Sequence, residues 1–129
     1  MIIDGQGCVL GRLASYVAKQ TLKGERIEIV NCNKVIISGR KKDIEKTFTE
    51  KRGRVGSGQK GPQPIKTSDR MVKRAIRGML PNFREGRGRE AFRKITCYVG
   101  VPKEFEEKKK VSIAKEGKQK FSRVEEFSK

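Results

Sequence analysis

One third of the chain, residues 51–94, concentrates most of the positive charge of the sequence. It holds fourteen Lys and Arg residues against three acids, Asp69, Glu85 and Glu90, so it contributes eleven of the seventeen net positive charges. Charges of one sign repel each other and destabilise a compact state. Such a segment needs an anionic partner, and nucleic acid best offsets the repulsion because it releases its own counterions when it binds.

Within this segment, residues 68–79 have the periodicity of an amphipathic helix. Four cations recur at the spacing of one helical face: Arg70, Lys73, Arg74 and Arg77. Four apolar residues recur on the opposite face: Val72, Ala75, Ile76 and Met79. By itself the pattern also fits an ordinary surface helix with a solvated basic face. The flanking segments favour a face that meets phosphate.

Both flanks are basic and contain glycine. Residues 51–64 hold four glycines and two prolines with almost nothing apolar, which predicts an extended loop that cannot fold unaided. Residues 84–94 continue the positive run through Gly86 and Gly88. Their arginines should fix the orientation of the protein on its partner, because each guanidinium can donate two hydrogen bonds to one phosphate. A basic helix between such segments suits the grooves of a large folded RNA. The candidate RNA-binding residues are Arg52, Arg54, Lys60, Lys66, Arg70, Lys73, Arg74, Arg77, Arg84, Arg87, Arg89, Arg93 and Lys94.

Composition predicts one intracellular domain. A chain of 129 residues with 34% apolar residues can form one small core, and no apolar run is long enough for a membrane span. The N-terminus lacks the layout of a signal peptide, so we expect a cytoplasmic protein. Cys8, Cys32 and Cys97 are odd in number and scattered, which indicates free, buried or half-buried thiols and no disulfide or zinc site. The six Phe and two Tyr residues occupy mostly positions that look buried or terminal, so we expect no aromatic platform for stacked bases.

The apolar pattern predicts an α/β fold. We expect strands at residues 1–4, 26–30, 35–37 and 95–99, and helices at residues 10–22, 41–48 (buried through Ile44 and Phe48) and 68–79. Strands alternating with helices favour a parallel sheet covered on both sides. Residues 104–110 are compatible with a helix, and the sequence after them keeps only isolated apolar residues. We expect this tail to dock on its own domain or on a partner.

Two glycine patterns resemble nucleotide sites. Gly5, Gly7 and Gly11 follow a strand and open a helix, but the third glycine is one residue late for a dinucleotide fingerprint. Asn31 also stands where an acid would bind a ribose, so a structural turn is the favoured interpretation. Residues 53–60 lack the Gly-Lys-Ser/Thr of a phosphate loop. Without any histidine, and with no paired carboxylates, the chain is not expected to be an enzyme.

Five blocks, in the same order, resemble one known family. They are Val9-Leu-Gly-Arg-Leu-Ala-Ser15, Ile29-Val-Asn31 followed by Val35-Ile-Ile-Ser-Gly39, Arg74-Ala-Ile-Arg-Gly-Met-Leu-Pro81, Gly86-Arg-Gly-Arg-Glu-Ala-Phe92 and Tyr98-Val-Gly-Val-Pro102. Together they resemble the ribosomal protein L-thirteen family of the large subunit over residues 1–105, closer to its archaeal and eukaryotic branch. One departure is Pro64-Ile-Lys-Thr-Ser-Asp-Arg70, where family members have aromatic residues and Arg-Ala-Pro-Ser.

The resemblance implies a three-layer α/β/α sandwich around a mainly parallel four-stranded sheet, with a basic loop and a C-terminal tail. It implies one α/β RNA-binding domain at residues 1–105, including the loop at 50–66, and an extension at 106–129. The implied function is a structural, non-catalytic role in the cytoplasmic large ribosomal subunit, with support of its assembly. The implied partners of the single copy are large-subunit rRNA and neighbouring ribosomal proteins, with no cofactor, membrane or small-molecule substrate. The alternative is a free RNA-binding regulator of translation that uses the same basic surface.

Overall fold

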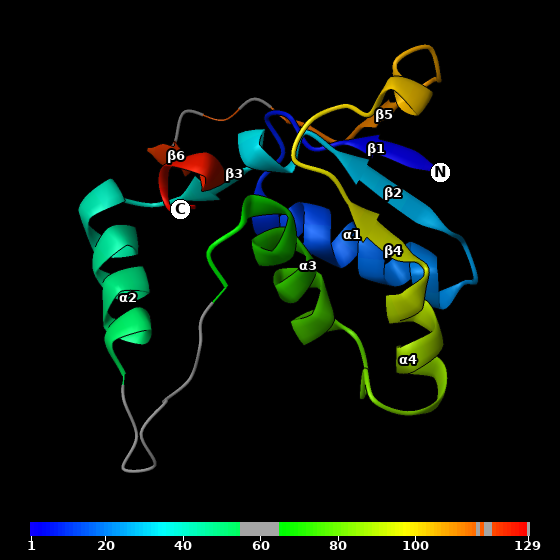
Figure 1. Ribbon diagram of the computed structural model, residues 1–129, viewed down its shortest axis with the longest axis horizontal. Helices are drawn as coiled ribbons and strands as arrows, with labels where there is room; N and C mark the ends of the chain where they lie inside the picture. Colours follow the sequence, from blue (N-terminus) through cyan, green and yellow to red (C-terminus); the bar gives the residue numbers. More distant parts are fainter. Residues whose placement is uncertain (55–64, 116, 118–119, 129) are drawn as a thin grey trace.

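The chain folds as short strands alternating with helices (Figure 1). This is a computed structural model, and it describes residues 1–54, 65–115, 117 and 120–128. The strands are β1 (Ile2–Asp4), β2 (Ile27–Val30), β3 (Ile36–Ser38), β4 (Ile95–Cys97), β5 (Val111–Ser112) and β6 (Phe121–Arg123). The helices are α1 (Leu10–Leu22), α2 (Lys41–Gly53), α3 (Ser68–Met79) and α4 (Gly86–Arg93). Three 3-10 turns are η1 (Cys32–Lys34), η2 (Lys103–Phe105) and η3 (Val124–Glu126).

Four strands form one parallel sheet in the order β4-β2-β1-β5. Ile3 of β1 lies opposite Ile29 of β2 and Val111 of β5, and Ile29 lies opposite Cys97 of β4. The expected α/β class and the parallel four-stranded sheet are confirmed.

The identity of the fourth strand differs from the expectation. We expected residues 35–37 to join the main sheet, but β3 pairs antiparallel with β6 in a separate two-stranded sheet. Strand β2 already has β1 and β4 on its two sides, and the short η1 turn between β2 and β3 cannot supply a parallel crossover. The fourth strand is β5, which comes from the C-terminal tail.

The layers follow from the strand order. The chain moves from β1 to β2 to β4 in one direction across the sheet, so right-handed crossovers place α1, α3 and α4 on the same face. Contacts of α1 with both α3 and α4 agree with this placement. The return from β4 to β5 crosses the opposite face and carries the η2 turn, where Phe105 is buried against Tyr98 with ring centroids 5.5 Å apart. This arrangement fits a three-layer α/β/α sandwich.

The core lies between the sheet and α1 and α3. Ile3, Ile27 and Ile29 of the strands are fully buried, as are Leu13 of α1 and Ile76 of α3. Within the described residues, no helix is long and apolar enough to cross a membrane.

Helix α2 stands apart from the other three helices (Figure 1). It runs five residues beyond the expected end at residue 48, and Ile44 and Phe48 are only half-buried. Its packing comes largely from the tail, because the Phe48 ring stacks on Phe127 at 5.3 Å and Lys41 pairs with Glu126 at 2.9 Å. The expected burial of α2 in the main core was therefore too strong.

The described part of the tail docks on the domain. Where a helix was considered for residues 104–110, the structure has only the end of the η2 turn. Strand β6 follows, and its neighbours Val124 and Phe127 join the hydrophobic core.

All three cysteines are free thiols, as expected, with Cys8 and Cys32 buried and Cys97 half-buried. The adjacent Cys97 thiol and burial raise the pKa of Cys32, so this thiol stays protonated and unreactive at neutral pH.

Candidate nucleic-acid interface

Helix α3 occupies residues 68–79, as predicted, and turns one face to the core. Met71, Val72 and Ile76 are buried, and α3 packs on α1 and β4. Met79 was expected on this buried face, but it is 46% exposed. The helix ends at Met79, and the next residue, Leu80, is buried in its place.

The opposite face of α3 carries the predicted cations. Arg70 and Arg74 are exposed, whereas Lys73 and Arg77 are half-buried. The difference arises because Lys73 and Arg77 lie over aromatic rings contributed by the segment that follows α3. The predicted separation of a packed face from a cationic face is confirmed.

Residues 86–93 form a helix, α4, that was not predicted from the sequence. Its glycines disfavour a helix in isolation, but Gly88 lets α4 pack closely on the preceding turn. A Cβ at Gly88 would clash with the carbonyl oxygens of both Pro81 and Asn82. Arg87, Arg89 and Arg93 are exposed on the outer side of this helix. Tertiary packing thus imposes a helix that local propensity does not favour.

Two phenylalanines connect the cations of α3 to those of residues 84–93, which we call the α4 segment. The Nζ of Lys73 lies 4.9 Å from the Phe92 ring centroid, and Cζ of Arg77 lies 4.7 Å from that of Phe83. Cζ of Arg84 lies 5.4 Å from the same Phe83 ring. The two rings contact each other with centroids 6.0 Å apart and an interplanar angle of 59°.

These rings had no predicted role in the site. The one hint in the sequence is that each phenylalanine is followed directly by an arginine, Phe83 by Arg84 and Phe92 by Arg93.

We call the cations on α3 and on the α4 segment the cationic surface. It comprises Arg70, Lys73, Arg74, Arg77, Arg84, Arg87, Arg89 and Arg93. In the part of the chain that the structure describes, none of them forms a salt bridge; the ion pairs there involve Arg26, Lys41, Lys46 and Arg123. The three acids of the segment, Asp69, Glu85 and Glu90, therefore leave these cations uncompensated. Such a surface favours a polyanionic partner.

The remaining candidate residues lie at different places. Lys66 and Arg54 are exposed near the two described ends of the basic loop, and Lys60 lies outside the described residues. Arg52 is half-buried and donates a hydrogen bond to the backbone carbonyl of Phe127, so its guanidinium is partly used within the fold. Lys94 donates to the carbonyl of Gly24 at 3.3 Å.

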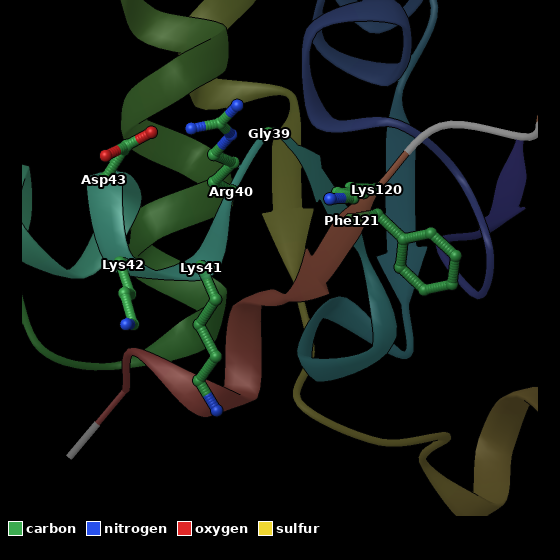
Figure 2. A pocket seen from close by; sticks show the side chains of 7 residues that line it. All are labelled: Gly39, Arg40, Lys41, Lys42, Asp43, Lys120 and Phe121. Atoms are coloured by element: carbon green, nitrogen blue, oxygen red, sulfur yellow. The ribbon is translucent and has the colours of Figure 1, made fainter.

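A second basic feature is a depression of about 390 Å³ at the start of α2 (Figure 2). It is lined by Gly39, Arg40, Lys41, Lys42, Asp43, Lys120 and Phe121. In Figure 2 the side chain of Lys120 extends toward the Gly39–Arg40 corner, whereas the Phe121 ring points away from it. The carboxylate of Asp43 lies in this lining, and Lys41 is already paired with Glu126. The depression is therefore less positive than the cationic surface.

Among the described residues, no three His, Cys, Asp or Glu side chains come together in a way that could hold a metal ion.

Comparison with known proteins identifies the family. A family model described as Ribosomal protein L13 matches residues 1–104. The chain belongs to this family. The large ribosomal subunit protein uL13 of Methanosarcina barkeri is 48% identical over 114 residues, covering 88% of this chain and 80% of the relative. The protein of the same name from Methanocaldococcus jannaschii is 44% identical over 114 residues, covering 86% and 82%.

The match with a third relative extends into the tail. The large ribosomal subunit protein uL13 of Archaeoglobus fulgidus is 39% identical over 126 residues, which cover 98% of this chain and 80% of the relative. The resemblance inferred from the five sequence blocks is confirmed, and these relatives are archaeal.

Proposed function

We propose that this chain is a structural constituent of the large ribosomal subunit and that it binds large-subunit rRNA through the cationic surface and the basic loop. Membership of the Ribosomal protein L13 family supports the ribosomal role, because the relatives are large-subunit proteins by name. The uncompensated cationic surface carries the RNA-binding part of the proposal. Its eight cations lack acidic partners in the described fold, and phosphates would supply them.

The mode of binding follows from the side chains. Arginine predominates over lysine on this surface, so bidentate contacts to phosphates should fix the orientation of the protein on its RNA. The aromatic rings on this surface, Phe83 and Phe92, already contact protein cations and each other, so they do not form an open platform for stacked bases. Recognition of folded RNA by shape and backbone fits these features better than recognition of an unstructured strand.

The role we propose is structural and not catalytic, needs no cofactor, and places one copy of the chain in the cytoplasmic ribosome beside other ribosomal proteins. Residues 1–105 form the RNA-binding domain, and residues 106–129 form an extension that completes the sheet through β5 and secures α2. Support of subunit assembly is part of the proposal, because cations on α3 and on the segment around α4 offer a folded RNA several points of contact.

Sedimentation of a cell extract at moderate salt tests the proposal. A ribosomal constituent co-sediments with the large subunit and is depleted from the top of the gradient. A free regulator of translation stays at the top, and that result would contradict the proposal. Treatment of the large-subunit fraction with ribonuclease is the control, because it should release the chain from rapidly sedimenting material.

A further inference from the structure

Two guanidinium groups share one aromatic ring on the cationic surface. Cζ of Arg77 lies 4.7 Å from the Phe83 ring centroid and Cζ of Arg84 lies 5.4 Å from it. The separation of the two guanidinium groups therefore cannot exceed the sum of these distances, although the residues belong to different segments. Attraction between a cation and the ring quadrupole holds each group in place.

The shared ring is itself held by the fold. Phe83 is half-buried and contacts Phe92 of α4, which also lies under Lys73. The backbone N–H of Arg84 donates to Oδ1 of Asn82 at 3.1 Å, which fixes the turn that carries Phe83. Close packing of Gly88 on the carbonyls of this turn fixes α4 against it. The position of both guanidinium groups is thus set before any ligand binds.

Holding two cations near one neutral ring costs free energy through their mutual repulsion. In the described part of the chain no carboxylate pairs with either arginine. The arrangement therefore becomes most favourable when anions lie between or beside the two groups. A sharply bent RNA strand, whose phosphates are crowded together, presents more negative charge to such a pair than a straight duplex does.

We propose that Phe83, supported by Phe92, is a positioning residue that holds Arg77 and Arg84 as a clamp for the crowded phosphates of a bent RNA strand. This inference rests on the proposed function and specifies the RNA geometry that the surface prefers. Preorganisation provides the gain in affinity, because the arginines lose less conformational entropy on binding than two free side chains would.

The test measures the affinity of the full chain for two synthetic RNAs of equal length, one a straight duplex and one a duplex bent by an internal bulge. The wild type should prefer the bent RNA, and Phe83→Tyr should keep that preference because it keeps the ring. Phe83→Leu keeps an apolar side chain but removes the ring, so the preference should fall by about threefold to tenfold, the size expected when one or two cation–π interactions are removed. An unchanged preference in Phe83→Leu would overturn the proposal.

A second variant tests the guanidinium groups while it keeps the Phe83 ring and the net charge. The double substitution Arg77→Lys with Arg84→Lys keeps both charges on exposed or half-buried side chains but removes the planar forks. It should lose the preference for the bent RNA while its thermal unfolding midpoint stays unchanged. Retention of the full preference by this variant would also overturn the proposal.

A third variant separates this inference from the proposed function. Arg70 and Arg74 lie on the same face of α3, and the cation–π contacts of the two rings in the described structure are made by Lys73, Arg77 and Arg84. Arg70→Gln with Arg74→Gln should therefore weaken binding to both RNAs equally. Equal weakening with no effect of Phe83→Leu on the preference would contradict the clamp alone. Wild-type affinity of the Arg70→Gln, Arg74→Gln variant for both RNAs would contradict the proposed interface and the clamp with it.

Discussion

The side chain of Asn31 donates a hydrogen bond from Nδ2 to Oδ1 of Asp4 at 3.0 Å and joins the carboxyl ends of β1 and β2. The same oxygen accepts a hydrogen bond from the backbone N–H of Gln6 at 3.0 Å, and Asn31 has a left-handed backbone with φ 56°. A dinucleotide fold needs an acid at the end of its second strand to bind a ribose. Here that position is an amide, and the nearby carboxylate is occupied by the turn itself.

Packing and backbone conformation also account for two glycines of this turn. A Cβ at Gly5 would lie 2.9 Å from Cγ2 of Val35 and 3.0 Å from the carbonyl oxygen of Val30. Gly7 has φ +73°, a backbone conformation that strains residues other than glycine. We therefore predict that isothermal calorimetry of the RNA-free chain detects no saturable binding of mononucleotides or dinucleotides. Micromolar binding that Gly7→Val abolishes without unfolding the chain would revive a nucleotide site.

Substitution of Gly88 should disrupt the packing of α4. The added methyl of Gly88→Ala would clash with the carbonyl oxygens of Pro81 and Asn82, and these backbone atoms cannot move aside easily. We expect a loss of about 2–3 kcal/mol of unfolding free energy, at the upper end of overpacking effects, measured by urea denaturation. The matched control is Gly78→Ala in α3, whose Cβ would have no neighbour within 4 Å. It should stabilise the chain by about 0.5–1 kcal/mol, and equal effects of the two substitutions would contradict the close approach.

Two residues of the last turn of α3, one buried and one exposed, should respond differently to a charge. Ile76→Asp places an unpaired carboxylate at a fully buried position and should cost about 4 kcal/mol or more, which unfolds a marginally stable domain. Met79→Asp puts the same group on a residue that is 46% exposed. Its cost should stay within about 1 kcal/mol, including the unfavourable position near a helix C-terminus. Circular dichroism during thermal unfolding distinguishes the two, and similar losses would mean that α3 is oriented differently.

Attachment of α2 should depend on pH through Glu126. The hydrogen bond from Lys41 holds the pKa of Glu126 below its usual range, and Glu126 raises the pKa of Lys41. Because the pKa of this carboxyl is lower in the folded chain, its ionised form stabilises the fold, and the full contribution is present at a pH above the ordinary glutamate pKa of about 4.3. The contribution is lost as the pH falls through the lowered pKa of the folded chain. Because the pKa of Lys41 is raised, Lys41 stays protonated and keeps the ion pair until the pH rises above the ordinary lysine pKa.

Hydrogen exchange measures this effect. Protection factors of α2 amides should decrease as the pH falls below about 4.3 in the wild type. They should be lower and nearly independent of pH in Glu126→Gln, which cannot ionise. Phe127→Leu is the control, because it weakens the stacking on Phe48 but keeps the ion pair and its pH dependence. Identical pH profiles for wild type and Glu126→Gln would show that the ion pair does not secure α2.

Sequence periodicity identified those elements whose local pattern agrees with their final packing. The bounds of α1 and α3 coincide with the expected ranges, because each has a regular apolar stripe that faces the core. The central cations of the interface followed from the same spacing. In both cases one segment of sequence contains all the information needed.

Features that depend on distant contacts could not be read in this way. Strand β5 has two exposed residues and pairs only because β1 offers it a free edge, and β3 leaves the main sheet because both sides of β2 are occupied. Helix α4 depends on the fit of Gly88 against residues 81 and 82. The role of Phe83, in the turn before α4, depends on its contact with Arg77 of α3.

The salt dependence of RNA binding tests the role of the cationic surface most directly. Removing one phosphate interaction should make the slope of log affinity against log salt shallower by about 0.7–0.9, so replacing Arg70, Lys73, Arg74 and Arg77 together by Gln should reduce it by about 3. The control replaces four exposed lysines outside the surface, Lys19, Lys23, Lys46 and Lys109, by Gln with the same change in net charge. We predict a much shallower slope and weaker binding for the first variant and a slope close to wild type for the control. An unchanged slope and affinity in the first variant, or equal changes in both, would contradict binding through this surface.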